Sequence, residues 1–473
     1  MQQQKSVGRG IRLTVAGTIV AVSVQALVTV VLLRLLTPSD YAQYAIAALV
    51  GAFSTQAAMS VLERAAMLMP DEDGLGGAGL SVGLVVLGSA GVALAVVALL
   101  SGLGLVAAPI GIVATLLAGH VATGFAVTPR ALLRRRMRYG PIVGAEVAAQ
   151  VVGTGLITVL LAAAGLGAYA IVIGGAAGSI ITLATTLIVT GREAFWPVRV
   201  TGLRPLAARA IRVLETSLVE TSILQIPVMV VSSLGATVLG LFNRAMNIVQ
   251  LPVQMVASAI SRVLVAELVR NASDPDAFRE TARRMLVLAT ATLFPICAGI
   301  AGAAHEFTAV VMGPQWIGAE QALPYLAITA AEMLVAGLLG LIADAAGQLR
   351  AKSRLLMGAA AILLASALAA LPLGLVGVAV ALMLANLVQV AMLIGLVSGK
   401  TRTGTLRMLR WLSPGIVAGA ICFAWSRLVS MWLNQPDAVV LGTQVLGCAV
   451  VVAAYYLIWH RPMVRELVGL LRG

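Results

Sequence analysis

The chain has 473 residues, of which 60% are hydrophobic and 11% are charged, and its mean hydropathy is +1.01. A soluble domain usually carries about 25% charged residues, and a soluble fold of this length could not bury so much apolar surface. The composition therefore excludes an ordinary soluble protein and predicts an integral membrane protein. The formal net charge is +13, but the basic residues fall between apolar runs, so we expect topology anchors and no nucleic-acid partner.

Long apolar runs recur along the whole chain. A helix needs about 20 apolar residues to cross a bilayer, and a continuous run can satisfy its own backbone groups in lipid only as a helix. The expected fold class is an all-α polytopic membrane protein with about 14 transmembrane helices. The expected spans are 12–33, 41–63, 79–100, 105–127, 141–163, 166–190, 212–233, 237–264, 285–311, 322–345, 355–371, 374–398, 412–433 and 438–459.

Lys and Arg gather in every second connection between the expected spans. One side includes Arg9 and the run RALLRRRMR at 130–138, whereas alternate connections such as TPSD at 37–40 hold almost no positive charge. Cytoplasmic loops carry the excess of Lys and Arg, so both termini are expected in the cytoplasm. The first apolar run shows no cleavable signal pattern, and we expect a multi-pass protein of the cytoplasmic (inner) membrane.

The first short connection is TPSD. It predicts a tight extracytoplasmic turn with Ser39 or Asp40 as the N-cap of the next helix. Arg34 lies about one turn before it, where an arginine matches the negative end of the preceding helix.

The chain resembles itself at a constant offset, which places 36–64 on 234–262. At this offset, rare polar residues fall on one another. Such matches seldom arise by chance in a sequence rich in Leu, Ala and Val. The coinciding pairs are Tyr44 with Phe242, Gln56 with Gln254, Ser60 with Ser258, and Arg64 with Arg262.

The offset spans six of the expected helices, so the two halves would share an orientation and form a parallel repeat. We expect an N-terminal lobe at 1–200 with helices 1–6 and a C-terminal lobe at 201–400 with helices 7–12. Residues 401–473 would add helices 13 and 14 and a cytoplasmic tail. A binding site between two lobes is usual in alternating-access transporters.

Polar side chains at membrane depth are costly and mostly face a bundle interior or a watery cavity. Four amides of the span 237–264 stand at i, i+4, i+7 and i+11 and share one helix face: Asn243, Asn247, Gln250 and Gln254. Arg244 lies beside this amide stripe. The stripe predicts a hydrated cavity that binds substrate.

Further candidates for the same cavity are amides, carboxylates and arginines in other spans. They are Gln25, Gln56, Gln225, Glu146, Glu215, Glu220, Glu332, Arg34, Arg64 and Arg262. Two simpler interpretations stay open: the amides bond neighbouring helices together, and Arg34, Arg64 and Arg262 anchor helix ends.

No catalytic or metal-binding pattern accompanies these stripes, so we expect no enzyme activity, no cofactor and no metal. Cys297, Cys422 and Cys448 lie in apolar runs without redox spacing and are expected as small core residues. His120 and His305 are expected as packed, hydrogen-bonded histidines within apolar spans.

Four stretches together resemble a known family. They are LRLLTPSDYAQYAIAALV at 33–50, TPRALLRRRMRYGPIVGAEVAAQVVG at 128–153, LGATVLGLFNRAMNIVQLPVQMVASAISRVLVAEL at 234–268 and VVMGPQWIGAEQALPYLAI at 310–328. The chain is similar in these, and in the number and order of helices, to the polysaccharide and O-antigen (Wzx-type) flippases. These belong to the multidrug/oligosaccharidyl-lipid/polysaccharide (MOP) exporter superfamily.

The resemblance implies a flippase that moves undecaprenyl-pyrophosphate-linked oligosaccharides for cell-surface polysaccharide synthesis. It implies membrane lipids as partners, polysaccharide polymerase or export machinery as candidate partners, and Arg244 as the best counterpart of the family's cavity arginines. The glycan, O-antigen, exopolysaccharide or another, stays open. Two alternatives also stay open: a multidrug or cation antiporter of the same superfamily, which the acidic candidates would suit, and a non-transporting scaffold, against which the polar stripes weigh.

Overall fold

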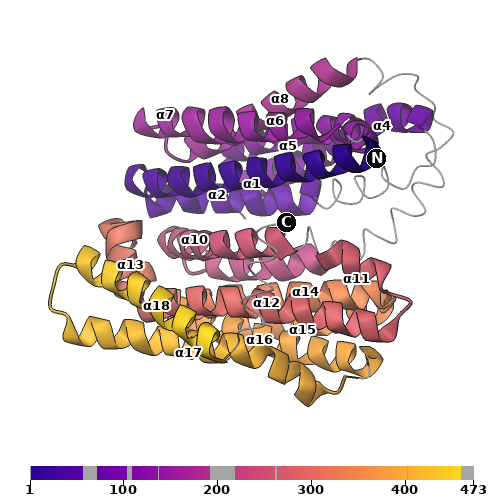
Figure 1. Cartoon of the computed structure of the whole chain (residues 1–473). Helices are drawn as coiled ribbons and strands as arrows, with labels where there is room; N and C mark the ends of the chain where they lie inside the picture. Colours follow the sequence, from indigo (N-terminus) through magenta and orange to yellow (C-terminus); the bar gives the residue numbers. More distant parts are fainter. Residues whose placement is uncertain are drawn as a thin grey trace. The chain divides into compact units, whose positions relative to one another are not determined.

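A computed structural model describes residues 2–56, 72–103, 109–136, 138–191, 219–260, 264–401 and 403–459. The chain divides into two compact units, Met1–Ser232 and Ser233–Gly473. The helices of each unit lie side by side with their axes running roughly from left to right in Figure 1. The predicted lobe boundary near residue 200 falls outside the described residues, so the lobe assignment stays a prediction.

Unit 1 is built from helices that follow the apolar runs of its sequence. Two segments have the wider π-helical turn, and η2 lies in the middle of one continuous span, Tyr139–Ala163. The elements are α1 (Gln2–Leu35), α2 (Pro38–Gly51), η1 (Ala52–Gln56), α4 (Glu72–Gly102), α5 (Ile110–Arg135), α6 (Tyr139–Ala148), η2 (Ala149–Ile157), α7 (Thr158–Ala163) and α8 (Ala168–Thr190), followed by the helix Val219–Ser232.

Unit 2 contains the two candidate spans with the largest buried share, Leu323–Ala345 and Pro275–Gly302. Its centre is α14, which packs against α10, α12 and α16. The elements are α10 (Ala236–Ile260), α11 (Ala266–Arg270), α12 (Pro275–Gly302), α13 (Ala304–Phe307), η6 (Thr308–Met312), η7 (Pro314–Ala319), α14 (Leu323–Ala345), α15 (Leu349–Ala369), η8 (Leu371–Leu373), α16 (Gly374–Thr401), α17 (Thr405–Trp432) and α18 (Asp437–Trp459).

These elements confirm the expected fold class, an all-α polytopic membrane protein. A helix covers all or part of each expected span, and within the described ranges nine helices are long and apolar enough to cross a membrane. Three shorter apolar helices add to them: Val20–Leu35, Gly83–Leu99 and Val219–Ser232. The total of 14 stays a prediction.

The cap of α2 differs from the expected one. Thr37, not Ser39 or Asp40, is the N-cap, and Pro38 is the first helical residue. Proline suits that position because its missing N–H needs no partner there. The Thr37 hydroxyl accepts a bond from the Asp40 N–H, and the Asp40 carboxylate accepts one from the Thr37 N–H at 2.9 Å, which is a capping box.

The boundaries of the ninth expected span also differ. The sequence predicts one span at 285–311, but α12 runs from Pro275 to Gly302 and the chain then breaks into α13 and η6. His305 therefore lies in the short helix α13, outside the long span. Asp274 caps α12 through the N–H groups of Asp276 and Ala277, which fixes its early start.

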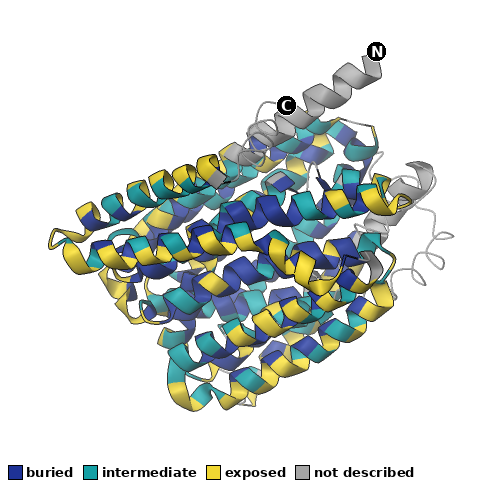
Figure 2. Cartoon of the chain, turned by 60° about the horizontal axis from the view of Figure 1, so that its bottom comes forward, coloured by how far each residue is buried: buried dark blue, intermediate teal, exposed yellow. Residues whose placement is uncertain are grey.

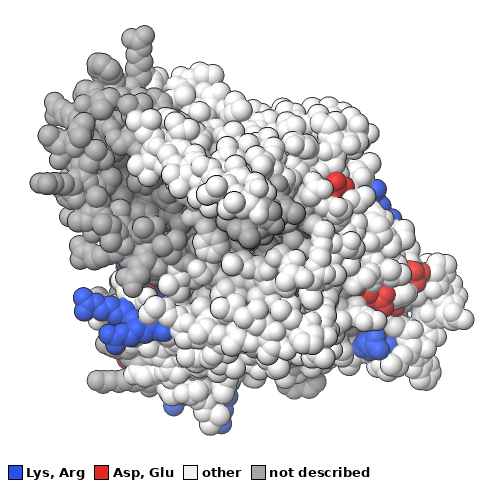
Figure 3. Space-filling model, turned by 180° about the vertical axis from the view of Figure 1, so that it is seen from behind, with Lys and Arg blue, Asp and Glu red and all other residues white. Residues whose placement is uncertain are grey.

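Apolar side chains cover much of the surface. Figure 2 shows buried residues along the inner helices and exposed ones along the outer faces, and the exposed residues include many Leu, Val and Ile. The face in Figure 3 is almost uncharged, with its blue and red atoms near the margins. Such a surface suits acyl chains, as a membrane-spanning fold requires.

Candidate functional site

The amide stripe lies on the more exposed face of α10. Asn247 and Gln254 are exposed, and Asn243 and Gln250 are half-buried. The opposite face is buried, with Val249 at 0% exposure. The Asn247 amide donates to the Asn243 side-chain oxygen at 2.9 Å and to the Asn243 carbonyl at 2.7 Å. The stripe is thus an ordered row of amides with its outer edge accessible.

Arg244 is placed differently from the stripe. It follows Asn243 by about 100° around the helix, at the edge of the buried face, and is 6% exposed. The structure thus buries the arginine that the sequence favours most for substrate contact. Its contact with an anionic substrate stays a prediction, and it would need a conformation in which this side chain is uncovered.

Gln250 and Glu332 do not face the same cavity. The Gln250 amide donates to the sulfur of Met333 in α14 at 3.4 Å. Glu332, the residue before Met333, is 9% exposed and lines a different cavity within unit 2, formed by α12, α14, α16 and α17. Adjacent residues on a helix point about 100° apart, so Met333 faces α10 while Glu332 faces away from it.

Gln25, a candidate of unit 1, forms a direct interhelical contact. The Gln150 amide in η2 donates to the side-chain oxygen of Gln25 in α1. This contact fits the simpler interpretation, in which buried amides bond neighbouring helices. Each amide keeps further hydrogen-bonding capacity.

Glu146 pairs with an arginine near the end of its helix. Its Oε1 lies 2.6 Å from the Arg130 guanidinium, and this ion pair joins α6 to α5. The side chains are 44% and 24% exposed, respectively. The structure thus shows this carboxylate paired with an arginine.

The other candidates are spread over unit 1 or lie outside the described residues. Glu220 and Gln225 are half-buried on the helix Val219–Ser232, Arg34 is exposed in the last turn of α1, and Gln56 ends η1. Arg64, Arg262 and Glu215 fall outside the described ranges.

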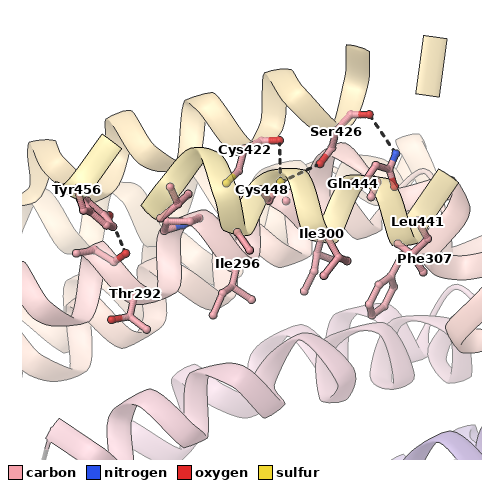
Figure 4. Close-up of a pocket in the computed structure, with 17 residues that line it drawn as sticks. Thr292, Ile296, Ile300, Phe307, Cys422, Ser426, Leu441, Gln444, Cys448 and Tyr456 are labelled. Atoms are coloured by element: carbon pink, nitrogen blue, oxygen red, sulfur yellow. Dashed lines mark hydrogen bonds between the residues drawn. The ribbon is translucent and has the colours of Figure 1, made fainter. Parts of the chain in front are cut away.

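A second feature of unit 2 is an apolar groove between α12, α17 and α18, with a volume of about 480 Å³ (Figure 4). A row of polar groups runs along one wall. Gln444 donates to the Ser426 carbonyl at 3.1 Å and to the Ser430 hydroxyl at 2.9 Å, and Ser430 donates to Glu306 at 2.6 Å. These bonds join α17 to α18 and α13.

Two features of the sequence point to the contacts of Gln444 and Glu146, although hydrophobic periodicity alone does not reveal them. Gln444 is an amide inside an apolar run, and Arg130 begins the basic run that precedes the isolated Glu146. A search for polar pairs between neighbouring helices would have found both. Across the residues that the structure describes, no group of His, Cys, Asp and Glu could hold a metal ion.

Long apolar helices that carry polar side chains along their length define the class of the molecule: a polytopic membrane protein. The family model described as polysaccharide biosynthesis protein matches residues 31–321, more than half of the chain. The chain therefore belongs to the polysaccharide biosynthesis protein family, which confirms the resemblance seen in the sequence motifs.

One curated relative is the teichuronic acid biosynthesis protein TuaB of Bacillus subtilis (strain 168). It is 30% identical over 95 residues, which make up 20% of this chain and 20% of TuaB. The chain thus matches a fifth of that relative's length.

Solved structures share the fold over most of the chain. The lipid II flippase MurJ, in an inward closed conformation, has a TM-score of 0.72 at 15% identity and covers 96% of this chain and 99% of MurJ. The eukaryotic MATE transporter AtDTX14 has a TM-score of 0.55 at 13% identity, over 85% of this chain and 100% of that one. The chain therefore shares its fold with these two membrane proteins.

Proposed function

We propose that this chain is a flippase that moves lipid-linked oligosaccharides across the cytoplasmic membrane for cell-surface polysaccharide synthesis. The observation that carries the proposal is the amide stripe of α10. The stripe is partly exposed within a membrane-spanning unit, and the chain belongs to the polysaccharide biosynthesis protein family. Side-chain amides both donate and accept hydrogen bonds, so a row of them suits sugar hydroxyls. The proposed carrier is undecaprenyl pyrophosphate.

The physical problem is the transfer of a polar head through hydrocarbon. An amide or hydroxyl that loses its hydrogen bonds to water costs about 4–8 kcal/mol in an apolar medium, and an oligosaccharide carries many such groups. A row of amides along a helix replaces part of that hydration. The prenyl chain needs no such help and would stay in the bilayer.

Charge acts on the pyrophosphate in two ways. Arg244 is the proposed counter-ion once it is uncovered. A negative-inside membrane potential also favours outward movement of an anion, by about 2.3 kcal/mol per charge per 100 mV. Because the pyrophosphate is negative, the membrane potential already favours its outward movement, and outward flipping does not require an ion gradient.

The test is the amount of lipid-linked oligosaccharide in the native host. We expect deletion of the gene to raise this pool and the wild-type chain to restore it. The double variant Asn247→Ala, Gln254→Ala should restore it poorly, because two lost hydrogen bonds at about 1 kcal/mol each slow transfer by about thirtyfold. Arg244→Ala should also slow export at matched protein level.

Met255→Ala is the matched control, because Met255 is 48% exposed on the same helix and its thioether is at most a weak hydrogen-bond acceptor. It should restore the pool fully. A deletion that leaves the pool unchanged but sensitises cells to cationic drugs would instead support the cation antiporter. Protection of cysteines along 243–254 from water-soluble reagents would support a scaffold.

A further inference from the structure

Unit 2 contains a cavity of about 500 Å³ that is separate from the amide stripe. It lies where α12, α14, α16 and α17 meet, and every residue that lines it belongs to unit 2. Pockets that hold drug-sized molecules have volumes of roughly 300–1,000 Å³ and are mostly apolar with a few polar groups. This cavity has that size and lining.

Glu332 is the charged residue of the lining. It is 9% exposed, and its Oε2 atom is buried without a hydrogen-bond partner among the described residues. Its position is near the middle of α14, a helix long enough to span the membrane. A carboxylate at such depth is costly unless a positive charge lies beside it, and no Lys or Arg of the described ranges lines this cavity.

The cavity opens on the apolar surface of α17. Leu409, Ile416 and Phe423 line it at intervals of about two turns along that helix and are 45%, 50% and 41% exposed. The inner wall is buried, with Cys297 at 1% and Leu412 at 5%. Because this surface belongs to a membrane-spanning helix, a molecule would enter from the acyl-chain region and must therefore be lipophilic.

We propose that this cavity binds a lipophilic organic cation, with Glu332 as its counter-ion. The lining offers one negative charge and almost no hydrogen-bonding groups, which fits a quaternary or otherwise shielded cation better than a sugar. Phe294 and Phe423 also line the cavity, and aromatic rings attract such cations.

This site differs from the one proposed for the oligosaccharide. A carboxylate repels a pyrophosphate, and Glu332 faces away from α10, whereas its neighbour Met333 contacts Gln250. Binding of a cation here is independent of the proposed flippase function, and the two are measured in different ways.

The experiment measures binding of radiolabelled tetraphenylphosphonium to the full-length chain in phosphatidylcholine nanodiscs, with empty nanodiscs as background. We expect saturable binding to the wild-type chain. Glu332→Gln keeps the shape and removes the charge, and it should weaken binding about thirtyfold or more, as expected when one member of a buried charge pair is lost. Tetraphenylborate, an anion of the same shape, should not displace the bound cation.

Two further variants locate the site. Ala420→Phe places a ring in the cavity from α17 and leaves Glu332 in place, so it should also abolish binding. Glu306→Gln removes another buried glutamate of unit 2, one that accepts a bond from Ser430, and should bind the cation normally. Equal binding by the wild type and Glu332→Gln, or displacement by tetraphenylborate, would overturn the proposal, since either result means an apolar or lipid-filled groove with a neutral carboxyl group.

Discussion

His305 is a single residue whose surroundings differ from those expected. The sequence predicts a packed histidine in an apolar span, but the end of α12 at Gly302 leaves it with a 54% exposed side chain. Its Nδ1 lies 3.1 Å from Glu320, and its Nε2 lies 3.9 Å from Asp437 at the start of α18. A third carboxylate, Glu306, belongs to the same short helix α13.

These contacts predict a pH-dependent stability. The hydrogen bond to Glu320, supported by the charges of Glu320, Asp437 and Glu306, raises the pKa of His305 above its usual 6.5. The protonated form is therefore favoured in the folded chain. The contribution of protonated His305 to the stability of the fold is complete below about pH 6.5. It is lost as the pH rises through the raised pKa.

The measurement is the Tm of the purified chain from about pH 6 to pH 9, a range in which ordinary carboxylates stay ionised. His305→Asn can still donate to Glu320 but does not titrate there. The wild type should exceed this variant in Tm at the acidic end, and the difference should shrink as the pH rises. Parallel curves would show that the His305 contacts do not stabilise the fold.

For the candidate site residues, the sequence predicts which of them share a helix face better than it predicts how deeply each is buried. The spacing of Asn243, Asn247 and Gln250 is enough to place them on one side of α10, because the helix repeat is fixed. The burial of Arg244 depends on which other helices cover α10, and no local pattern records that. The pairing of Glu146 with its arginine likewise depends on the turn between α5 and α6.

At the level of elements, η2 and α8 are held together by glycines. A methyl group on Gly153 would overlap the backbone of Gly178 and lie 3.1 Å from the Gly174 carbonyl. Gly174 and Gly178 form the small-xxx-small pattern that allows close approach of membrane helices. The π-helical segment therefore packs its backbone directly on α8, next to the Gln25–Gln150 contact.

Gly153→Ala should separate these two elements. Overpacking of a tight interface costs about 1–3 kcal/mol, so we expect a lower Tm. Gly175→Ala is the matched control, because the space around Gly175 on α8 is open and alanine favours a helix by about 1 kcal/mol over glycine. Similar Tm changes in both variants would rule out close glycine packing as the cause.

Helix type and approximate position follow from hydropathy, but helix ends do not. Hydropathy merges α12 with α13 and η6 because apolar residues continue through the break at Ala303. It also starts the helix late, because the first turns of α12 are rich in charge. The Asp274 cap and a buried face that includes Phe278 and Ala282 make these turns helical. Ends are set by caps and by the packing of the next element, as Thr37 shows for α2.

Across the whole molecule, the predicted repeat stays a prediction, and the starts of the helices can be compared with its offset. α2 begins at Pro38 and α10 at Ala236, in agreement with the offset at which the sequence matches itself. The later helices drift from that offset: α5 and α14, which begin at Ile110 and Leu323, lie farther apart in the sequence. Loops of different length explain the drift, and they also explain why the self-match in the sequence is clear near one hairpin and weak elsewhere.

The repeat and the charge pattern together predict which turns face which side. Leu166 lies in the turn between α7 and α8, and Leu349 begins α15; they are 39% and 57% exposed. Within the described ranges, α8, Val219–Ser232, α10, α12 and α14 separate them. Five crossings place the two positions on opposite sides, and Arg350 and Lys352 mark the second as cytoplasmic.

Single cysteines at these two positions test the arrangement, in a background in which Cys297, Cys422 and Cys448 are replaced. A membrane-impermeant maleimide should label Leu166→Cys in spheroplasts and Leu349→Cys only after the membrane is permeabilised. The reverse pattern would invert the orientation of the chain. Labelling of both from outside would mean that one of the five helices does not cross, and the short length of the helix before α10 makes it the first to examine.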